Sequence, residues 1–275
     1  MSQGLSFPAA RQRALETLSG HAFTHLQQPN NILGVEYLKA LALLDPQKSI
    51  TPFTLPRQAA AHHADAPKGR YASASWLRTQ GRAGRDLSAY LPESALRVYA
   101  REVAQGRAPL SMQPLETALL AHLRRTTPAH WKTLSGVSEG LENRLCRAAG
   151  QARSMEEFLV LVKNKRVPLA RLRRLMLGSF LGISDELVRQ EPPYLRLLAA
   201  SEAGMCALTA VKQNAALPLL VKPAASKSLS SEAQRIFAVD CLVTDMLSLL
   251  YPDPAQRTGG DEWRTTPVLI HAQRT

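Results

Sequence analysis

Apolar residues recur at intervals of three and four along most of the chain, and this spacing predicts a mainly helical protein. Near the start, Pro8 precedes a run of good helix formers, which predicts a helix over residues 7–18. A second helix is predicted over residues 32–41, directly after Asn30 and Asn31. An asparagine at such a place can cap the free amides of a first turn, and Asn31 is the expected cap.

Beyond residue 73 the helical pattern is almost continuous. Two short apolar runs, residues 194–199 and 217–221, interrupt it and flank a helix predicted at 202–214. That order of strand, helix and strand predicts a small parallel pair with a crossover connection. The other helices are predicted over residues 75–80, 93–105, 114–125, 139–149, 155–165, 169–181 and 232–250.

The N-terminal part has a different character. Residues 50–55 combine β-branched and aromatic side chains, which predicts one short strand that ends just before Arg57. Loops are predicted over residues 58–71 and 253–266, and a linker rich in Pro, Ala and Ser over 222–231. The composition changes near residues 73–92, so we predict a mixed α/β part up to residue 92 and a helical body over 93–275.

The charge balance adds a candidate partner. The 275 residues include 34 Lys+Arg and 22 Asp+Glu, a net charge of +12, and the isoelectric point is about 10.1. Such an excess favours a polyanion such as nucleic acid or a nucleotide. The positive charge is concentrated in residues 158–184. They contain no acidic side chain and six basic ones, Lys163, Lys165, Arg166, Arg171, Arg173 and Arg174.

We interpret this span as a basic turn between two helices that lies along an RNA backbone. The alternative is a solvated basic helix face. Few aromatic residues interrupt it, so base stacking is not its expected task.

The sequence gives little support for a membrane segment, a disulfide framework or a metal site. The chain has no apolar run of the roughly 18 residues that a membrane span needs and no export signal at its start, so we expect a cytoplasmic protein without a membrane partner. Three widely spaced cysteines argue against a disulfide framework or a zinc site. His62, His63 and Asp65 lack further ligands at a suitable spacing, and we predict no structural metal.

Several segments together carry a family resemblance. Residues 29–41, Pro-Asn-Asn-Ile-Leu-Gly-Val-Glu-Tyr-Leu-Lys-Ala-Leu, resemble a signature of the tRNA(Met) cytidine acetate ligase family, a branch of the HIGH-type nucleotidyltransferases. Further segments agree in order along nearly the whole chain: Arg57 with His63 and Asp65, then residues 72–78, 139–144, 163–166 with 171–174, 193–196 and 240–245.

The resemblance implies a fold and an activity. The fold class would be α/β plus mostly α: residues 1–92 as the C-terminal part of a Rossmann-like, ATP-binding nucleotidyltransferase domain, and 93–275 as a mainly helical tRNA-binding domain with a small α/β tail. The reaction would join ATP and acetate into acetyl-adenylate and acetylate N4 of the wobble cytidine of elongator tRNA(Met). Mg²⁺ is expected to accompany ATP.

The same resemblance implies the ATP-contacting residues. Asn30 and Arg57 match family positions that contact ATP, and an arginine fork suits phosphate. Ser73, Ser75 and Arg78 belong to a serine-rich motif at a helix N-terminus, where free amides and the dipole favour the triphosphate. The alternative is a helix cap for Asn30 and the serines and a solvated charge for Arg57. The sequence assigns no catalytic residue.

One family feature is missing from the sequence. Family members carry a glycine-containing loop with a His-x-Gly-His motif that grips the ATP phosphates, whereas this chain offers only His21-Ala22-Phe23-Thr24-His25. The chain resembles the later two thirds of the family, as a truncated or degenerate member, and we expect it to be inactive alone. Two alternatives stay open: a non-catalytic RNA-binding module with a decayed ATP site, or another HIGH-type nucleotidyltransferase.

Overall fold

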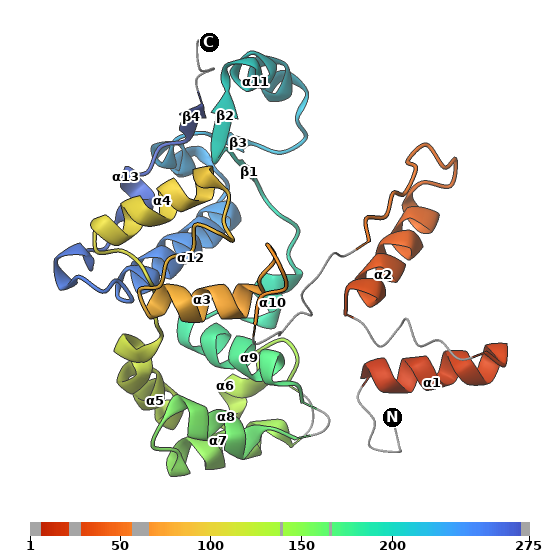
Figure 1. Cartoon of the computed structure of the whole chain (residues 1–275), viewed down its shortest axis with the longest axis vertical. Coiled ribbons are helices and arrows are strands. Elements are labelled where there is room, and N and C mark those ends of the chain that lie inside the picture. The colour runs from red at the N-terminus through yellow and green to blue at the C-terminus, as the bar shows by residue number, and fades with distance from the viewer. Residues whose placement is uncertain (1–6, 22–28, 57–65, 138–139, 165–166, 271–275) are drawn as a thin grey trace.

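The computed structural model describes residues 7–21, 29–56, 66–137, 140–164 and 167–270. These residues form a predominantly helical protein (Figure 1). The helices are α1 (Phe7–Ser19), α2 (Pro29–Leu44), α3 (Ala74–Arg82), α4 (Glu93–Ala104), α5 (Glu116–Arg125), α6 (Pro128–Lys132), α7 (Leu141–Gln151), α8 (Met155–Val162), α9 (Leu169–Leu181), α10 (Asp185–Arg189), α11 (Glu202–Asn214), α12 (Ser231–Ser248) and α13 (Asp261–Arg264). The strands are β1 (Leu195–Arg196), β2 (Ala199–Ser201), β3 (Leu219–Leu220) and β4 (Val268–Ile270).

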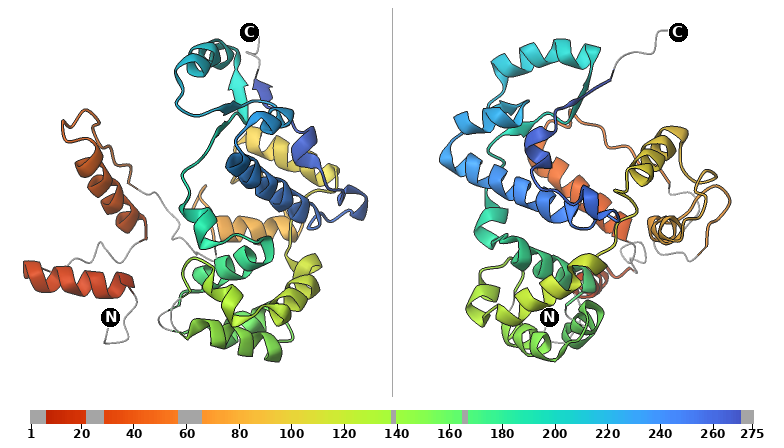
Figure 2. Two further views of the ribbon diagram at one scale, coloured as in Figure 1. Left: turned by 180° about the vertical axis from the view of Figure 1, so that it is seen from behind. Right: turned by 90° about the vertical axis from the view of Figure 1, so that its left-hand side faces the viewer.

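The first two helices form an arm beside the body. α1 and α2 lie next to each other and apart from all later helices (Figures 1 and 2). The guanidinium of Arg11 on α1 forms an ion pair with Glu36 on α2, and Lys39 Nζ lies 2.9 Å from the same carboxylate. The hydrogen bonds from Lys39 and Arg11 lower the pKa of Glu36. The Arg11–Glu36 ion pair therefore joins the two helices of the arm.

The start of α2 corrects one prediction. The helix begins at Pro29, so Asn30 and Asn31 lie inside its first turn and Asn31 is not the cap. Proline suits the first helical position because its φ is already helical and its missing N–H would have no partner there. Pro29 thus moves the helix start to a position before both asparagines.

The strand predicted over residues 50–55 is also wrong. Residues 51–56 have no regular secondary structure and belong to no sheet, and their side chains are exposed, including those of Phe53 and Leu55. A strand needs a neighbour for its backbone N–H and C=O groups. The described residues before position 92 provide none, since their sole β-contact is an isolated bridge between Lys68 and Tyr71.

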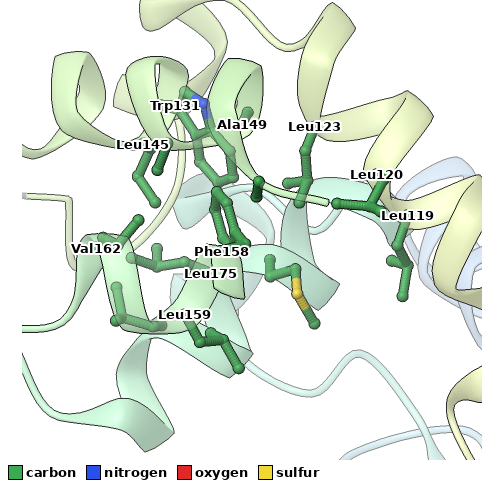
Figure 3. Packing of buried hydrophobic residues seen from close by; sticks show 14 of the residues in the cluster. Leu119, Leu120, Leu123, Trp131, Leu145, Ala149, Phe158, Leu159, Val162 and Leu175 are labelled. Atoms are coloured by element: carbon green, nitrogen blue, oxygen red, sulfur yellow. The ribbon is translucent and has the colours of Figure 1, made fainter. Parts of the chain in front are cut away.

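The main hydrophobic core lies among α5, α6, α7, α8 and α9. Trp131, Leu145, Phe158 and Val162 are completely buried and point toward one another (Figure 3). Arg124 donates a hydrogen bond to the Ala152 carbonyl at 3.1 Å and so ties α5 to the end of α7. This core fixes the positions of the helix ends that carry the basic side chains described below.

A second, smaller core lies under the C-terminal segments. β1 pairs in parallel with β3, and α11 lies between them in sequence, which confirms the predicted parallel pair and its crossover. β2 pairs in parallel with β4. Tyr194 and Phe237 are buried here, and the Tyr194 hydroxyl donates to Asp240 Oδ2 at 2.8 Å. Burial and the carboxylate of Asp240 both raise the pKa of Tyr194.

Two predicted irregular segments are partly helical. The predicted linker at 222–231 forms a 3₁₀-helix, Pro223–Ser228, and leads into α12, whose first turn is capped by Ser230. The predicted loop at 253–266 contains a 3₁₀-helix, Pro254–Gln256, and α13. Both segments contain proline. At the first position of a short helix, proline starts the helical turn and does not break it. No helix in the described part of the chain is long and apolar enough to cross a membrane.

Candidate nucleotide and nucleic acid interface

The serine-rich motif lies at the N-terminus of α3, as its sequence predicts. Ser73 is the N-cap, and its hydroxyl accepts a hydrogen bond from the Trp76 backbone N–H at 3.1 Å. The side chain is buried, with 4% of its surface exposed. Trp76 in turn packs edge-on against Tyr90, with ring centroids 5.0 Å apart. The cap of this helix is therefore part of the local packing.

Ser75 and Arg78 lie on the more accessible side of the same helix. Arg78 Nη2 donates to Ser75 Oγ at 3.4 Å, a long contact. Arg78 and Arg82 line a cavity of about 340 Å³ together with Tyr99 and Pro109. The ATP-binding role of Ser73, Ser75 and Arg78 stays a prediction, and Ser73 already serves the helix.

We expect Ser73→Ala to lower the free energy of unfolding by about 1 kcal/mol, because the first turn of α3 loses its cap. Ser73→Thr keeps a hydroxyl at the cap and serves as the control. Chemical denaturation of the variants checks this, and an unchanged midpoint for Ser73→Ala would contradict the assigned role.

The other two predicted ATP contacts lie elsewhere. Asn30 is exposed in the first turn of α2, on the arm that Figure 1 shows apart from α3. Arg57, like His63 and Asp65, falls outside the described residues. The cavity that Arg78 and Arg82 line includes neither Asn30 nor Ser73. The role of Asn30 and of the α3 motif toward ATP stays a prediction.

The basic turn joins α8 to α9. α8 ends at Val162, three residues before the predicted end, and Val167 closes the turn by donating its N–H to Asn164 Oδ1 at 2.8 Å. Lys163 is exposed at the start of this turn, whereas Lys165 and Arg166 lie outside the described residues. Lys163 therefore faces solvent at the start of the turn.

Arginines continue the basic surface onto α9. Arg173 and Arg174 are exposed, and Arg171 donates a hydrogen bond to the Gly136 carbonyl. Arg171 and Arg174 border a cavity of about 490 Å³ with largely apolar walls, including Leu175 and Ile183. The predicted RNA-binding residues of α9 thus lie together on its first two turns, but their role toward RNA stays a prediction.

Acidic groups close to this surface are already paired. Arg189 Nε lies 2.6 Å from Asp185 Oδ2 on α10, and hydrogen bonds from Arg189 and Ser135 lower the pKa of Asp185. On α7 the carboxylate of Glu142 is buried, and its Oε1 lies 3.7 Å from Lys132 Nζ. The charge of Glu142 is therefore paired within the fold.

Sequence reasoning missed two arginines on α7 as candidate ligands for a polyanion. Arg144 donates from Nε and Nη2 to the Leu161 carbonyl, at 3.2 and 3.0 Å, and from Nη2 to the Lys163 carbonyl at 3.1 Å. Arg147 follows on the same exposed face. The signal that could have revealed them is the stripe of donors at every fourth position, Asn143, Arg147 and Gln151.

Metal-binding groups are sparse. No three His, Cys, Asp or Glu side chains gather into a possible metal site within the described ranges.

Comparison with protein families gives a match over nearly the whole chain. Residues 1–262 match the family model described as HIGH Nucleotidyl Transferase. A protein of Syntrophomonas wolfei named tRNA(Met) cytidine acetate ligase is 32% identical over 284 residues, covering 98% of this chain and 68% of the relative. A protein of the same name from Caldanaerobacter subterraneus is 32% identical and covers 91% of this chain and 63% of its own length. The chain thus spans about two thirds of the length of these relatives.

Solved structures agree with the sequence matches. The apo structure of Thermotoga maritima TmcAL superimposes with a TM-score of 0.87 at 28% identity and covers 98% of this chain and 69% of its own. The structure of the same protein bound with alpha-thio ATP gives a TM-score of 0.83 at 27% identity. This match covers 98% of this chain and 68% of the Thermotoga maritima chain.

Proposed function

Because the chain belongs to the HIGH nucleotidyltransferase family, and within it to the ATP-dependent tRNA(Met) cytidine acetate ligases, we propose that it takes part in ATP-dependent acetylation of a cytidine in tRNA(Met). The observation that carries the proposal is the relationship along 98% of the chain at 32% identity to a relative with that name. A related structure bound with an ATP analogue supports ATP as the activating substrate.

The proposed reaction has two steps. An acetate oxygen attacks the α-phosphorus of ATP, which forms acetyl-adenylate and releases pyrophosphate. The N4 amine of the wobble cytidine in elongator tRNA(Met) then attacks the acetyl carbonyl, and AMP leaves. Activation is needed because a free carboxylate is a poor acyl donor, and the leaving AMP makes the second step favourable.

We assign the chain's own residues to binding and charge neutralisation. Arg78 is exposed in the second turn of α3, where its guanidinium would meet phosphate oxygens and stabilise the negative charge of the departing pyrophosphate. Asn30 and Arg57 are proposed contacts to ATP. Mg²⁺ would enter with ATP, held by triphosphate oxygens and water, since the described residues provide no carboxylate cluster for it.

The tRNA would bind along the basic surface of the helical body. Lys163, Arg171, Arg173 and Arg174 lie on the turn and on the first two turns of α9, where they can neutralise successive phosphates. We propose the same role for Lys165 and Arg166.

A second candidate is a non-catalytic RNA-binding module. It is favoured by the use of the Ser73 hydroxyl as a helix cap and by the separation of Asn30 from α3 (Figure 1). Both candidates require tRNA binding, and only the first requires chemistry.

Three measurements on the purified chain separate the candidates, with the Syntrophomonas wolfei relative as the positive control. The first is elongator tRNA(Met) binding, the second is acetate-dependent exchange of pyrophosphate into ATP, and the third is formation of N4-acetylcytidine. Exchange and acetylation support the ligase. Binding without either supports the module, exchange with another acid but not acetate identifies a different nucleotidyltransferase, and absence of tRNA binding contradicts both proposals.

A further inference from the structure

A polar groove runs along the exposed face of α7, outside the predicted basic turn. Its volume is about 340 Å³, and we call it the α7 groove; its lining includes Asn143, Arg144, Arg147, Gln151 and Leu161. Its side chains are two guanidinium groups, two carboxamides and aliphatic carbon, with no carboxylate among the lining residues. A groove with this set of donors suits an anionic ligand.

The arrangement of the donors fits an extended anion. Asn143, Arg147 and Gln151 follow one another at intervals of four residues, and a helix rises 1.5 Å per residue, so the row is about 12 Å long. A single phosphate or carboxylate would occupy a fraction of that length. A chain of phosphates could contact the row along its whole extent.

Arg144 is held in place before any ligand arrives. Its Nε and Nη2 are bound to the carbonyls of Leu161 and Lys163, at 3.0 to 3.2 Å. Nη1 makes no hydrogen bond to the described residues and is available to an anion. Because the orientation of the guanidinium is fixed by backbone oxygens, little side-chain entropy is lost when it binds a ligand.

The same hydrogen bonds connect the α7 groove with the basic turn. Lys163 is the first residue of that turn, and its carbonyl oxygen is the acceptor for Arg144. The groove and the turn are therefore neighbouring parts of one surface. Arg147 lies one helical turn beyond Arg144, makes no ion pair or hydrogen bond within the described ranges, and extends that surface along α7.

We propose that the α7 groove binds the phosphodiester backbone of RNA, with Arg147 as an ionic contact and Asn143 and Gln151 as neutral donors. This rests on the proposed function, since it takes the tRNA of that reaction as the ligand. It adds a second stretch of RNA contact, on α7, to the one proposed for the turn and α9. The sequence motifs assign no ligand to Arg147, Asn143 or Gln151.

The ionic and neutral roles can be told apart by salt dependence. Each lost phosphate contact lowers the slope of log affinity against log salt by about 0.7 to 0.9. We expect Arg147→Gln to weaken tRNA binding about threefold to tenfold at low salt and to lower the slope by that amount. Asn143→Ala should weaken binding by a few-fold without a change in slope, because a neutral donor releases no counterion.

The matched control is Arg97→Gln on α4, which removes one exposed arginine far from α7 in sequence. Binding of fluorescent elongator tRNA(Met) is measured by anisotropy over a series of salt concentrations, and circular dichroism confirms that each variant is folded. If Arg147→Gln binds tRNA with the same affinity and the same salt slope as Arg97→Gln, the inference is overturned. Equal competition by poly-glutamate would assign the groove to acidic peptides and also overturn it.

If the unaltered chain does not bind tRNA, the proposed function fails as a whole. If it binds tRNA and Arg147→Gln binds equally well, the proposed function stands and the α7 groove is not a part of the interface.

Discussion

Phe158→Ala is expected to lower the free energy of unfolding by about 3 to 5 kcal/mol. Phe158 lies on α8 with none of its surface exposed, in the core shared with Trp131 and Leu145 (Figure 3). Truncation removes most of a buried aromatic side chain and leaves a cavity that helices on all sides cannot close without moving. The effect is large because this core joins five helices.

The matched control lies on the same helix. Val160 is two residues away but 66% exposed, so Val160→Ala should change the free energy of unfolding by no more than about 0.5 kcal/mol. Urea unfolding, followed by circular dichroism, gives both values. Similar midpoints for the two variants would contradict the assignment of Phe158 to the core.

The helices with a strong apolar period could be predicted from the sequence. α4, α9 and α11 begin and end within about one residue of the predicted ranges, because the apolar spacing and the proline or serine directly before each helix specify them locally. β1 and β3 were predictable for a similar reason, since each is a short apolar run beside a helix. Such elements depend mainly on nearby residues.

The errors have a different origin. Residues 50–55 carry strand-forming side chains, but a strand exists only with a partner, and partners are set by distant parts of a chain. Asn31 resembles a cap, yet Pro29 starts the helix earlier. α6 and α10 were missed because helices of five residues are too short to show a period, and capping by Thr127 and Ser184 defines them instead.

The residues of the candidate site also differ in whether nearby sequence alone could identify them. A charge count was enough to find Arg173 and Arg174, because six basic residues follow one another without an acidic one. Arg147 lies outside the span of residues 158–184 and five residues after Glu142, so a count of charges along the sequence does not single it out. In the structure Glu142 is buried against Lys132, whereas Arg147 is exposed.

Two arginines of the proposed RNA surface are held by backbone carbonyls. Arg144 ties α7 to the end of α8 through the Lys163 carbonyl, and Arg171 ties α9 to the loop after α6 through the Gly136 carbonyl. The positions of both guanidinium groups therefore do not depend on a bound ligand.

Reversal of two charges on α9 is therefore expected to have the largest effect on RNA binding. Arg173→Glu combined with Arg174→Glu would remove the two proposed phosphate contacts and place two negative charges beside the RNA backbone. We expect at least about tenfold weaker binding of elongator tRNA(Met) at low salt, and a salt slope smaller by about 1.5 to 2. Both side chains are exposed, so the fold should be unaffected.

Arg97→Glu with Arg101→Glu on α4 is the matched control, because it changes the net charge by the same amount at two exposed arginines four residues apart. A loss of affinity that is equal in both double variants would show a general effect of net charge, and it would refute a localised interface on α9. A loss confined to the α9 variant identifies the surface. The same measurement with a duplex DNA of equal length distinguishes preference for tRNA from attraction to any polyanion, because charge neutralisation alone does not depend on the shape of the nucleic acid.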